Sequence, residues 1–333
     1  MALTPIFDLH ADVFMDLVRR AEARGGDAPA ELAVRHLSRL EAGGIFGAVL
    51  TDCRMAGETA EPAHLERFIA RVRAELDAAG GKVLLVRAAA DLGRALTGGA
   101  FAAIVGYEGL SAAKGDPGWI RRLHGEAGPR VAVLTHNDDN EFGGGALGTL
   151  GGLPQGQALG LTEKGREAVA LMNELGILID MSHAGKATRR DILKASKRPV
   201  MLSHTSAKAV YDNGRNLSDE EMRAIADSGG LIGCMTSPAA LAPAADRGRR
   251  SLDRYMEHLR HMIGAAGIDH VGLGLHFCEY LYTPEEYPPV AGLEDASKAQ
   301  AIPEALLAAG LTEDDVEKIA WKNFARVFAL AVG

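Results

Sequence analysis

The sequence predicts an α/β protein with a (β/α)8 barrel, because eight short apolar runs alternate with stretches of helical spacing. Continuous apolar runs of this length are typical of parallel strands that are covered on both faces. The 333 residues suffice for one such barrel with insertions, and neither a linker nor an internal repeat divides them, so we expect a single domain over residues 1–333. The predicted strands are Ile6–Leu9, Phe46–Leu50, Ala103–Gly106, Val131–Leu134, Gly176–Ile179, Val200–Leu202, Leu231–Cys234 and Val271–Leu275.

Most of the intervening stretches place apolar residues at helical spacing, with charged residues on the outer face. Ser218 begins a capping box with Glu221 three residues later, which predicts where one helix starts. The predicted helices include Leu65–Ala78, Thr162–Leu175, Asp219–Asp227, Leu252–Ala265 and a terminal helix at Thr312–Phe328, for which Thr312 is the expected N-cap.

Two stretches interrupt this alternation and are expected to be long loops. Residues 137–160, after the fourth predicted strand, are rich in Gly, Asn and Asp. Residues 277–303, after the eighth, contain Tyr280, Tyr282 and Tyr287. Long loops are uncommon in compact folds and often carry function.

The composition narrows the possible functions. The chain is 47% hydrophobic and 24% charged, and its formal charge of −8 argues against nucleic acid as a partner. No apolar run reaches the length of a membrane span, and the first residues do not resemble a signal peptide, so we expect a cytoplasmic protein with no membrane partner. Cys53, Cys234 and Cys278 form neither a disulfide pattern nor a zinc motif and are expected to be buried, reduced thiols.

Polar residues stand where the first predicted strand ends. His10 and Asp12 are two residues apart, so both side chains leave the strand on one side, and this pair suits a divalent cation such as zinc. A His-x-Asp triplet also arises by chance in a chain with eleven histidines, and a single histidine after a strand is more often structural. The other strand ends therefore decide between these interpretations.

Five strand ends offer histidine, two of these also offer an acid, and a sixth strand end offers Glu108. In a barrel the active site lies at the carboxyl ends of the strands, so these side chains should converge. Such a cluster has enough ligands for two divalent metals, with a carboxylate able to bridge them. The residues at the later strand ends are Glu108, His136, Asp180, His183, His204 and His276.

Several motifs together resemble the renal (membrane) dipeptidase family of the amidohydrolase superfamily. They are DLHAD, GYEG, LTHNDDN, GLTEKGREAVALMNELGILIDMSH, PVMLSHTSA, RNLSDE and GIDHVGLG, and the resemblance runs from residue 8 to the terminal WKNFARVF. It implies a distorted TIM-type (β/α)8 barrel of the metal-dependent hydrolase type. It also implies two Zn²⁺ per chain and hydrolysis of dipeptides through a bridging hydroxide.

The resemblance also assigns residues to the metals. His10 and Asp12 would bind one zinc, and His183 and His204 would bind the second. Glu108 would bridge the two ions. These five are the ligands that the strand ends themselves suggest.

Two further residues receive roles on the substrate. The resemblance implies that His136 lies near the scissile carbonyl oxygen and polarises it, and that Arg215 binds the substrate's C-terminal carboxylate. Arg215 would otherwise be taken for a solvated loop residue.

The chain departs from the family at the last predicted strand. The family pattern has an aspartate that meets the substrate amine and is positioned for proton transfer, and this chain has His276. A neutral histidine can accept a proton but cannot supply a negative charge. We therefore expect His276 to contribute to catalysis and substrate binding, with weaker recognition of the amine.

Three functions fit these observations. The first is a zinc-dependent dipeptidase. The second keeps the metals and changes the substrate to another small amide, a β-lactam or a lactone. The third is a weakly active homologue that binds a small ligand or a partner chain, and a homodimer is possible in each case.

Overall fold

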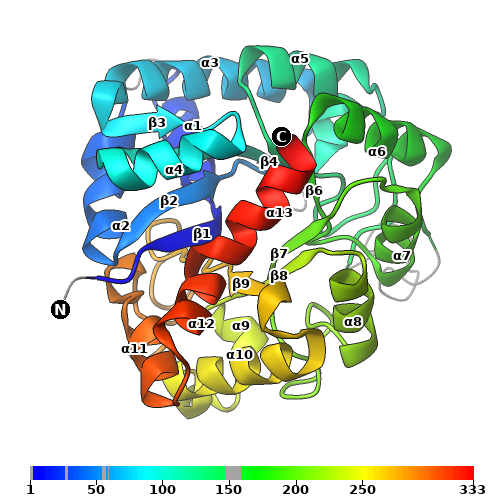
Figure 1. Cartoon of the computed structure of the whole chain (residues 1–333). Helices are drawn as coiled ribbons and strands as arrows, with labels where there is room; N and C mark the ends of the chain where they lie inside the picture. The colour runs from blue at the N-terminus through cyan, green and yellow to red at the C-terminus, as the bar shows by residue number, and fades with distance from the viewer. Residues whose placement is uncertain (1–2, 27–28, 55–57, 59, 147–158) are drawn as a thin grey trace.

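Eight parallel strands form the predicted barrel in a computed structural model, which describes residues 3–26, 29–54, 58, 60–146 and 159–333 (Figure 1). Each strand pairs in parallel with the next along the order β1-β2-β4-β5-β6-β7-β8-β9, so the predicted fold class is confirmed. The strands are β1 (Ile6–Ala11), β2 (Ile45–Leu50), β4 (Phe101–Glu108), β5 (Val131–Val133), β6 (Leu178–Asp180), β7 (Met201–Thr205), β8 (Leu231–Cys234) and β9 (Val271–Leu273).

A ninth strand, β3 (Val83–Leu85), lies outside the ring and was not predicted. It pairs with the first residues of β4, Phe101 to Ala103, whereas β5 pairs with the last ones, Gly106 to Glu108. One edge of the eight-residue strand β4 therefore pairs first with β3 and then, further along, with β5. β3 has only three residues, and all of them are half-buried. An apolar run this short is not enough to predict a strand from the sequence.

The barrel closes between β9 and β1 by isolated contacts, since no ladder is found there among the described residues. The backbone N–H of His276 donates to the carbonyl oxygen of His10 at 3.2 Å. The buried Asp8 carboxylate accepts hydrogen bonds from the N–H of Leu275 at 2.8 Å and from the N–H of His10 at 3.1 Å. Side chain and backbone together thus join the first and last strands.

Helices surround the barrel, and the predicted ones lie where expected to within three residues at their starts. The capping box at Ser218 and Glu221 is present, and the Thr162 hydroxyl caps its helix by accepting the N–H of Gly165 at 3.0 Å. The helices are α1 (Val13–Ala23), α2 (Ser38–Ala42), α3 (Pro62–Ala79), α4 (Ala89–Gly98), α5 (Gly118–Glu126), α6 (Glu163–Leu175), α7 (Lys186–Ala195), α8 (Asp219–Asp227), α9 (Pro238–Leu241), α10 (Leu252–Ala266), α11 (Ala301–Ala308), α12 (Glu313–Glu317) and α13 (Asn323–Val332).

The terminal helix differs from the prediction, because a wider turn of π type at Lys318–Lys322 separates α12 from α13. This turn brings α13 across the amino-terminal end of the barrel (Figure 1). Phe324 of α13 stacks on Phe7 of β1 with ring centroids 4.2 Å apart, and both belong to the apolar cluster inside the barrel. The amino-terminal half of the barrel is thus filled with hydrocarbon, which leaves the carboxyl end for polar groups.

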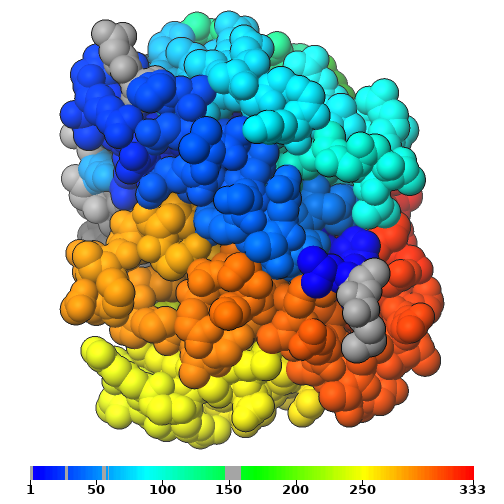
Figure 2. All heavy atoms as spheres, turned by 90° about the vertical axis from the view of Figure 1, so that its left-hand side faces the viewer, coloured from blue at the N-terminus to red at the C-terminus, as the bar shows by residue number. Residues whose placement is uncertain are grey.

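The segment after β9 returns to the amino-terminal part of the chain. Residues 277–300 form turns and one short 3-10 helix, Ala296–Lys298, before α11 begins. The Gln300 amide donates to the carbonyl oxygens of Thr4 and Gly43, both at 2.9 Å. Figure 2 shows this orange segment against the blue one that contains α2.

The first predicted loop, 137–160, lies partly outside the described residues, because 147–158 are not among them. Within the described part of the chain, no helix is both long enough and apolar enough to cross a membrane. Cys53, Cys234 and Cys278 are buried and free, as predicted.

Candidate metal centre

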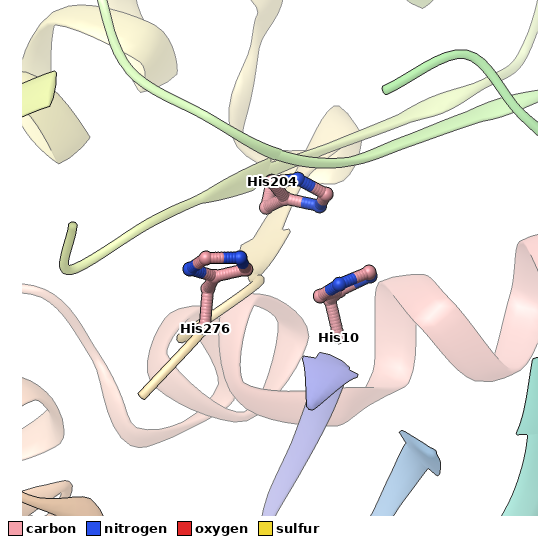
Figure 3. A group of neighbouring side chains, drawn as sticks. All are labelled: His10, His204 and His276. Carbon is pink, nitrogen blue, oxygen red and sulfur yellow. The ribbon is translucent and has the colours of Figure 1, made fainter. Parts of the chain in front are cut away.

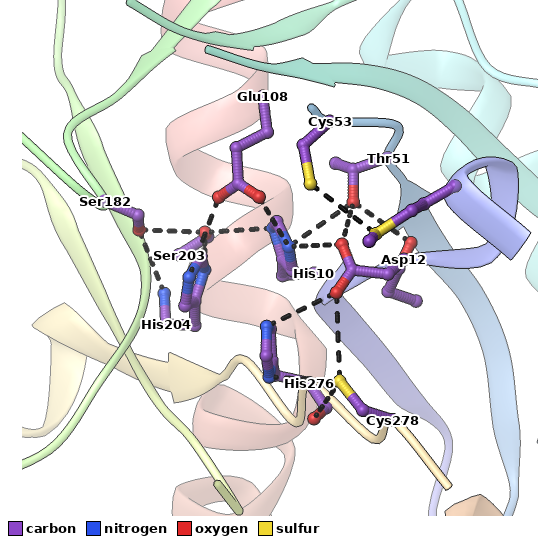
Figure 4. Close-up of polar contacts among 12 residues, drawn as sticks. His10, Asp12, Thr51, Cys53, Glu108, Ser182, Ser203, His204, His276 and Cys278 are labelled. Carbon is purple, nitrogen blue, oxygen red and sulfur yellow. Dashed lines mark hydrogen bonds and ion pairs between the residues drawn. The ribbon is translucent and has the colours of Figure 1, made fainter. Parts of the chain in front are cut away.

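The carboxyl ends of the strands carry a buried cluster of histidines and acids (Figure 4). His10 lies in β1, Asp12 follows it, and Glu108 is the last residue of β4. His204 lies in β7, and His183 stands three residues after the end of β6. The structure therefore brings the five predicted ligands together from four strands.

Three of these residues form a first group. His10 Nε2 lies 3.1 Å from Asp12 Oδ1 and 3.7 Å from Glu108 Oε2. The Thr51 hydroxyl donates to Asp12 Oδ1 at 3.1 Å, which holds this carboxylate in place. The three donor atoms lie close enough to bind one metal ion together.

The second group shares Glu108 with the first. His183 Nε2 lies 3.2 Å from Glu108 Oε1, and His204 Nε2 lies 3.7 Å from the same oxygen. The two imidazole nitrogens are 2.9 Å apart. Because Oε2 faces the first group and Oε1 the second, the Glu108 carboxylate stands between two candidate cation positions.

The hydrogen bonds of the second group fit a cation. His183 Nδ1 lies 2.8 Å from Asn137 Oδ1, an amide oxygen that only accepts, so a neutral His183 carries its proton on Nδ1. His204 Nδ1 is 2.8 Å from the Ser203 hydroxyl, and when Nδ1 donates to that hydroxyl, the Nε2 electron pair is available to a cation as well. Buried Glu108 Oε1 has no hydrogen-bond partner. Three electron pairs thus converge on one point, and a divalent cation is the species that this arrangement suits.

The separations agree with zinc geometry. Bonds of about 2.1 Å to nitrogen and oxygen place neighbouring ligands of a tetrahedral zinc about 3.4 Å apart. The distances in the second group run from 2.9 to 3.7 Å and those given for the first from 3.1 to 3.7 Å. Both groups are therefore of the right size for the ion.

Burial sets the protonation of these side chains. It lowers the pKa of His183 and of His204 well below the ordinary value, so both are neutral and able to bind metal. It raises the pKa of Glu108 to about 7. Burial also lowers the pKa of His10, but the carboxylates of Glu108 and Asp12 outweigh it and raise that pKa to about 9. A bound cation would replace the proton that His10 otherwise holds.

Two of the histidines have backbone angles that are unusual for residues other than glycine. His183 has φ 62° and His276 has φ 53°, both in the left-handed region. The hydrogen bond from the N–H of Ala146 to the His183 carbonyl oxygen, at 2.7 Å, holds the first of them. Such conformations concentrate at functional sites, and here they direct two imidazoles into the cluster.

His136 and Arg215, two of the three residues assigned to substrate, reach the same centre. The His136 ring stacks on His183 with centroids 4.2 Å apart, and its Nε2 is 3.8 Å from Glu108 Oε2. Arg215 Nη1 donates to Asn137 Oδ1 at 3.2 Å and lies 3.0 Å from His183 Nδ1. Asn137 was not predicted, because an asparagine in a polar loop gives no signal of its own.

His276 packs against one histidine of each group. Its ring packs against those of His204 and His10, with centroids 4.8 and 5.2 Å away (Figure 3). Its Nε2 is 3.4 Å from Asp12 Oδ2, and its Nδ1 is 3.5 Å from the sulfur of Cys278. Burial lowers the pKa of His276 to about 4, so this imidazole is neutral. Cys278 was predicted only as a buried thiol, although its spacing from His276 repeats that of His10 and Asp12.

Asp180, an acid predicted at a strand end, supports the site without reaching it. Its Oδ1 accepts the backbone N–H groups of Ser182 and Ser203, both at 2.9 Å. It therefore fixes the segments that carry His183 and His204. Asp8 plays the same part for the segment that carries His10.

Apart from Asp8, His10 and Asp180, the residues of the centre line a cavity of about 500 Å³, a size suited to a small molecule. Tyr282 and Tyr287, from the segment after β9, form part of its wall. A larger hollow of about 1100 Å³ between α1 and α3 contains none of the candidate ligands. Of these two cavities, only the smaller is lined by candidate ligands.

Comparison with known proteins shows the family of the chain. The family described as membrane dipeptidase (peptidase family M19) matches residues 1–331. Two uncharacterised dipeptidases of Schizosaccharomyces pombe are each 32% identical, over 228 and 232 residues, which are 68% and 69% of this chain. The matches span 52% and 53% of those proteins, so the chain corresponds to about half the length of these relatives.

Two solved structures share the fold. A crystal structure of a family M19 metallopeptidase described as dipeptidase AC is 25% identical, with a TM-score of 0.83 over 100% of both chains. A metallopeptidase from Rhodobacter sphaeroides, liganded with a phosphinate mimic of the dipeptide L-Ala-D-Ala, is 24% identical, with a TM-score of 0.82 over 99% of this chain and 100% of that one.

Proposed function

This chain belongs to the membrane dipeptidase family, peptidase family M19, and we propose that it is a zinc-dependent hydrolase that cleaves the amide bond of dipeptides. The observation that carries the proposal is the shared Glu108, whose two oxygens face two groups of buried ligands in one cavity. Family membership makes metal dependence the expected chemistry.

We propose that two zinc ions occupy the centre, one held by His10 and Asp12, the other by His183 and His204, with Glu108 between them. Imidazole and carboxylate are ordinary zinc donors, and the convergence of their free electron pairs supports the assignment. Bound there, the ions would supply Lewis acidity and a bridging hydroxide at neutral pH. Thr51, Ser203 and Asn137 hydrogen-bond to three of these ligands and fix their orientation.

Arg215 would bind the substrate's free carboxylate. Burial lowers the pKa of Arg215 to about 10, so the guanidinium remains a cation at neutral pH. It lines the cavity beside His183, and its planar fork matches a carboxylate in shape. This placement would set the scissile carbonyl of a short substrate near the metal groups.

His136 would stabilise the carbonyl oxygen as negative charge develops on it. Burial lowers the pKa of His136 to about 3, so its ring is neutral and donates through one N–H. A preorganised donor of this kind in a buried site stabilises the transition state by electrostatics.

His276 would accept or deliver the proton that the leaving amine needs. Its neutral ring has a free electron pair for this purpose but offers no charge to a substrate ammonium group. This observation favours a second candidate function, in which the substrate is another small amide, a β-lactam or a lactone that lacks a free amine.

One experiment tests both functions. Protein purified without chelator is analysed for metal and assayed with free dipeptides, C-amidated dipeptides, N-acyl amino acids, β-lactams and lactones. We expect two zinc ions per chain and turnover of substrates with a free carboxylate. Protein with two zinc ions that hydrolyses only the β-lactams or lactones would replace the first function by the second, and metal-free inactive protein would contradict both.

A further inference from the structure

His276 and Cys278, together with the second carboxylate oxygen of Asp12, place three donor atoms beside the two predicted metal groups. The Cys278 sulfur is 3.5 Å from His276 Nδ1 and 3.8 Å from Asp12 Oδ2 (Figure 4). One donor from each residue lies within 4.8 Å of the other two. The set is buried apart from the imidazole, which is partly exposed to the cavity.

The separations match those of a bound metal. Zinc bonds of about 2.3 Å to sulfur and about 2.1 Å to nitrogen or oxygen give sulfur-to-ligand distances of about 3.6 Å in a tetrahedron. Both sulfur distances lie within a few tenths of an ångström of this value. The two separations from the sulfur are therefore close to those of a bound metal, the three donors lie within 4.8 Å of one another, and the cavity leaves room for a water molecule as fourth ligand.

The tautomer of His276 also suits this role. Its Nε2 faces Asp12 Oδ2 at 3.4 Å, and a carboxylate oxygen only accepts, so the proton of the neutral ring belongs on Nε2. Nδ1 then keeps its electron pair and lies 3.5 Å from the Cys278 sulfur, and the ring turns to present this pair to an ion that Asp12 Oδ2 also binds. Asp12 serves both neighbours, since its other oxygen, Oδ1, faces His10.

We propose that Asp12, His276 and Cys278 form a third metal position, which takes a thiophilic divalent cation such as cadmium or excess zinc and whose filling inhibits the enzyme. On binding, the Cys278 thiol releases its proton to solvent and the sulfur bonds to the metal. The thiolate then supplies one negative charge to the ion, and Asp12 shares its carboxylate between this ion and the first zinc. Inhibition follows because the metal occupies the electron pair with which His276 would accept a proton during catalysis. Only this inhibition, and not the binding of the metal, rests on the proposed function.

The binding test starts from the zinc-loaded enzyme. It is dialysed against graded cadmium, and zinc and cadmium per chain are measured together by mass spectrometry, with the thiolate–cadmium absorbance recorded in the near ultraviolet. We expect one cadmium per chain to bind without loss of zinc and to produce the absorbance. Cadmium that only replaces zinc one for one, or that binds without the thiolate band, would overturn the proposal.

Two variants identify the sulfur. Cys278→Ser should keep its zinc and lose both the band and the additional cadmium, or bind that cadmium at least about tenfold more weakly. Cys53→Ser is the matched control, because Cys53 is a second buried thiol in the wall of the same cavity, and it should bind cadmium as the wild type does. Loss of the band in Cys53→Ser instead would place the site elsewhere. If Cys278→Ser does not fold, protection of Cys278 from alkylation by cadmium in the wild type decides the question, and absence of protection would overturn the proposal.

The inhibition arm uses dipeptide hydrolysis, with each variant compared with its own rate without cadmium. The cadmium concentration for half-inhibition should rise at least about tenfold in Cys278→Ser and stay unchanged in Cys53→Ser. Equal inhibition of Cys278→Ser and wild type would overturn the regulatory part. A protein that binds the third ion but cleaves no dipeptide would refute the proposed function and leave the metal position standing.

Discussion

Replacing Glu108 by glutamine should empty the second metal position and abolish turnover. Glutamine keeps the shape of the side chain and removes its charge, and the second group then consists of two neutral imidazoles without any anion. The first group retains Asp12 as an anionic ligand. The loss should therefore fall mainly on the ion at His183 and His204.

The size of the effect follows from the position of the carboxylate. Mutations of groups that merely support a metal ligand usually cost 10- to 100-fold in metal affinity or activity. Glu108 faces both groups directly, so we expect at least about 100-fold weaker binding of the second zinc, or about 2.7 kcal/mol. kcat/KM should fall by at least the same factor.

The assay is zinc per chain after dialysis at graded free zinc, together with kcat/KM for a free dipeptide. Glu75→Gln is the matched control, because Glu75 is a fully buried glutamate in α3 whose carboxylate binds backbone N–H groups far from the centre. It should retain two zinc ions. A Glu108→Gln protein with two tightly bound zinc ions and the wild-type rate would remove Glu108 from the metal centre and refute the reasoning.

Three further predictions address substrate and fold. Arg215→Met should raise KM for free dipeptides at least about tenfold, and the wild type should turn over C-amidated dipeptides poorly; equal rates on both substrates would contradict the carboxylate assignment. His276→Asp should raise kcat/KM for free dipeptides at least about tenfold, or about 1.4 kcal/mol, because the aspartate supplies a negative charge to the substrate ammonium group. Unchanged turnover with two metals per chain would mean that His276 does not stand in for such an aspartate. Phe324→Ala should lower the free energy of unfolding by about 3–5 kcal/mol, measured by denaturant titration, because it removes the ring that stacks on Phe7. A loss under about 1 kcal/mol would mean that the packing of α13 against the end of the barrel contributes little to stability.

The eight barrel strands were predictable because a parallel strand buried on both faces must be apolar along its whole length. β3 had no such signature, since it is short, half-buried and fixed by the spare edge of β4. The break between α12 and α13 also escaped prediction. The pattern around Lys318–Lys322 is helical in sequence, and only packing against the end of the barrel requires the wider turn.

At the site, the residue types at the strand ends carried most of the information, because parallel strands bring their carboxyl ends to one place. Arg215 was found only through the family resemblance, since a loop arginine becomes buried or exposed according to contacts made far along the chain. Asn137 was missed for the same reason, as its partners are His183 and Arg215. Cys278 could have been found from its two-residue spacing from His276.

The seam between β9 and β1 has a consequence for biosynthesis. β1 leaves the ribosome before the other strands of the barrel. Until residues near 276 have been made, its free edge has neither the Leu275 N–H for Asp8 nor the His276 N–H for His10. The nascent chain therefore carries an unpaired strand edge of the kind that recruits other chains. Asp8 is a charged side chain on that edge, and it discourages such pairing until the last strand arrives. The metal centre around His10 can therefore be fully organised only after the last strand of the barrel has been translated.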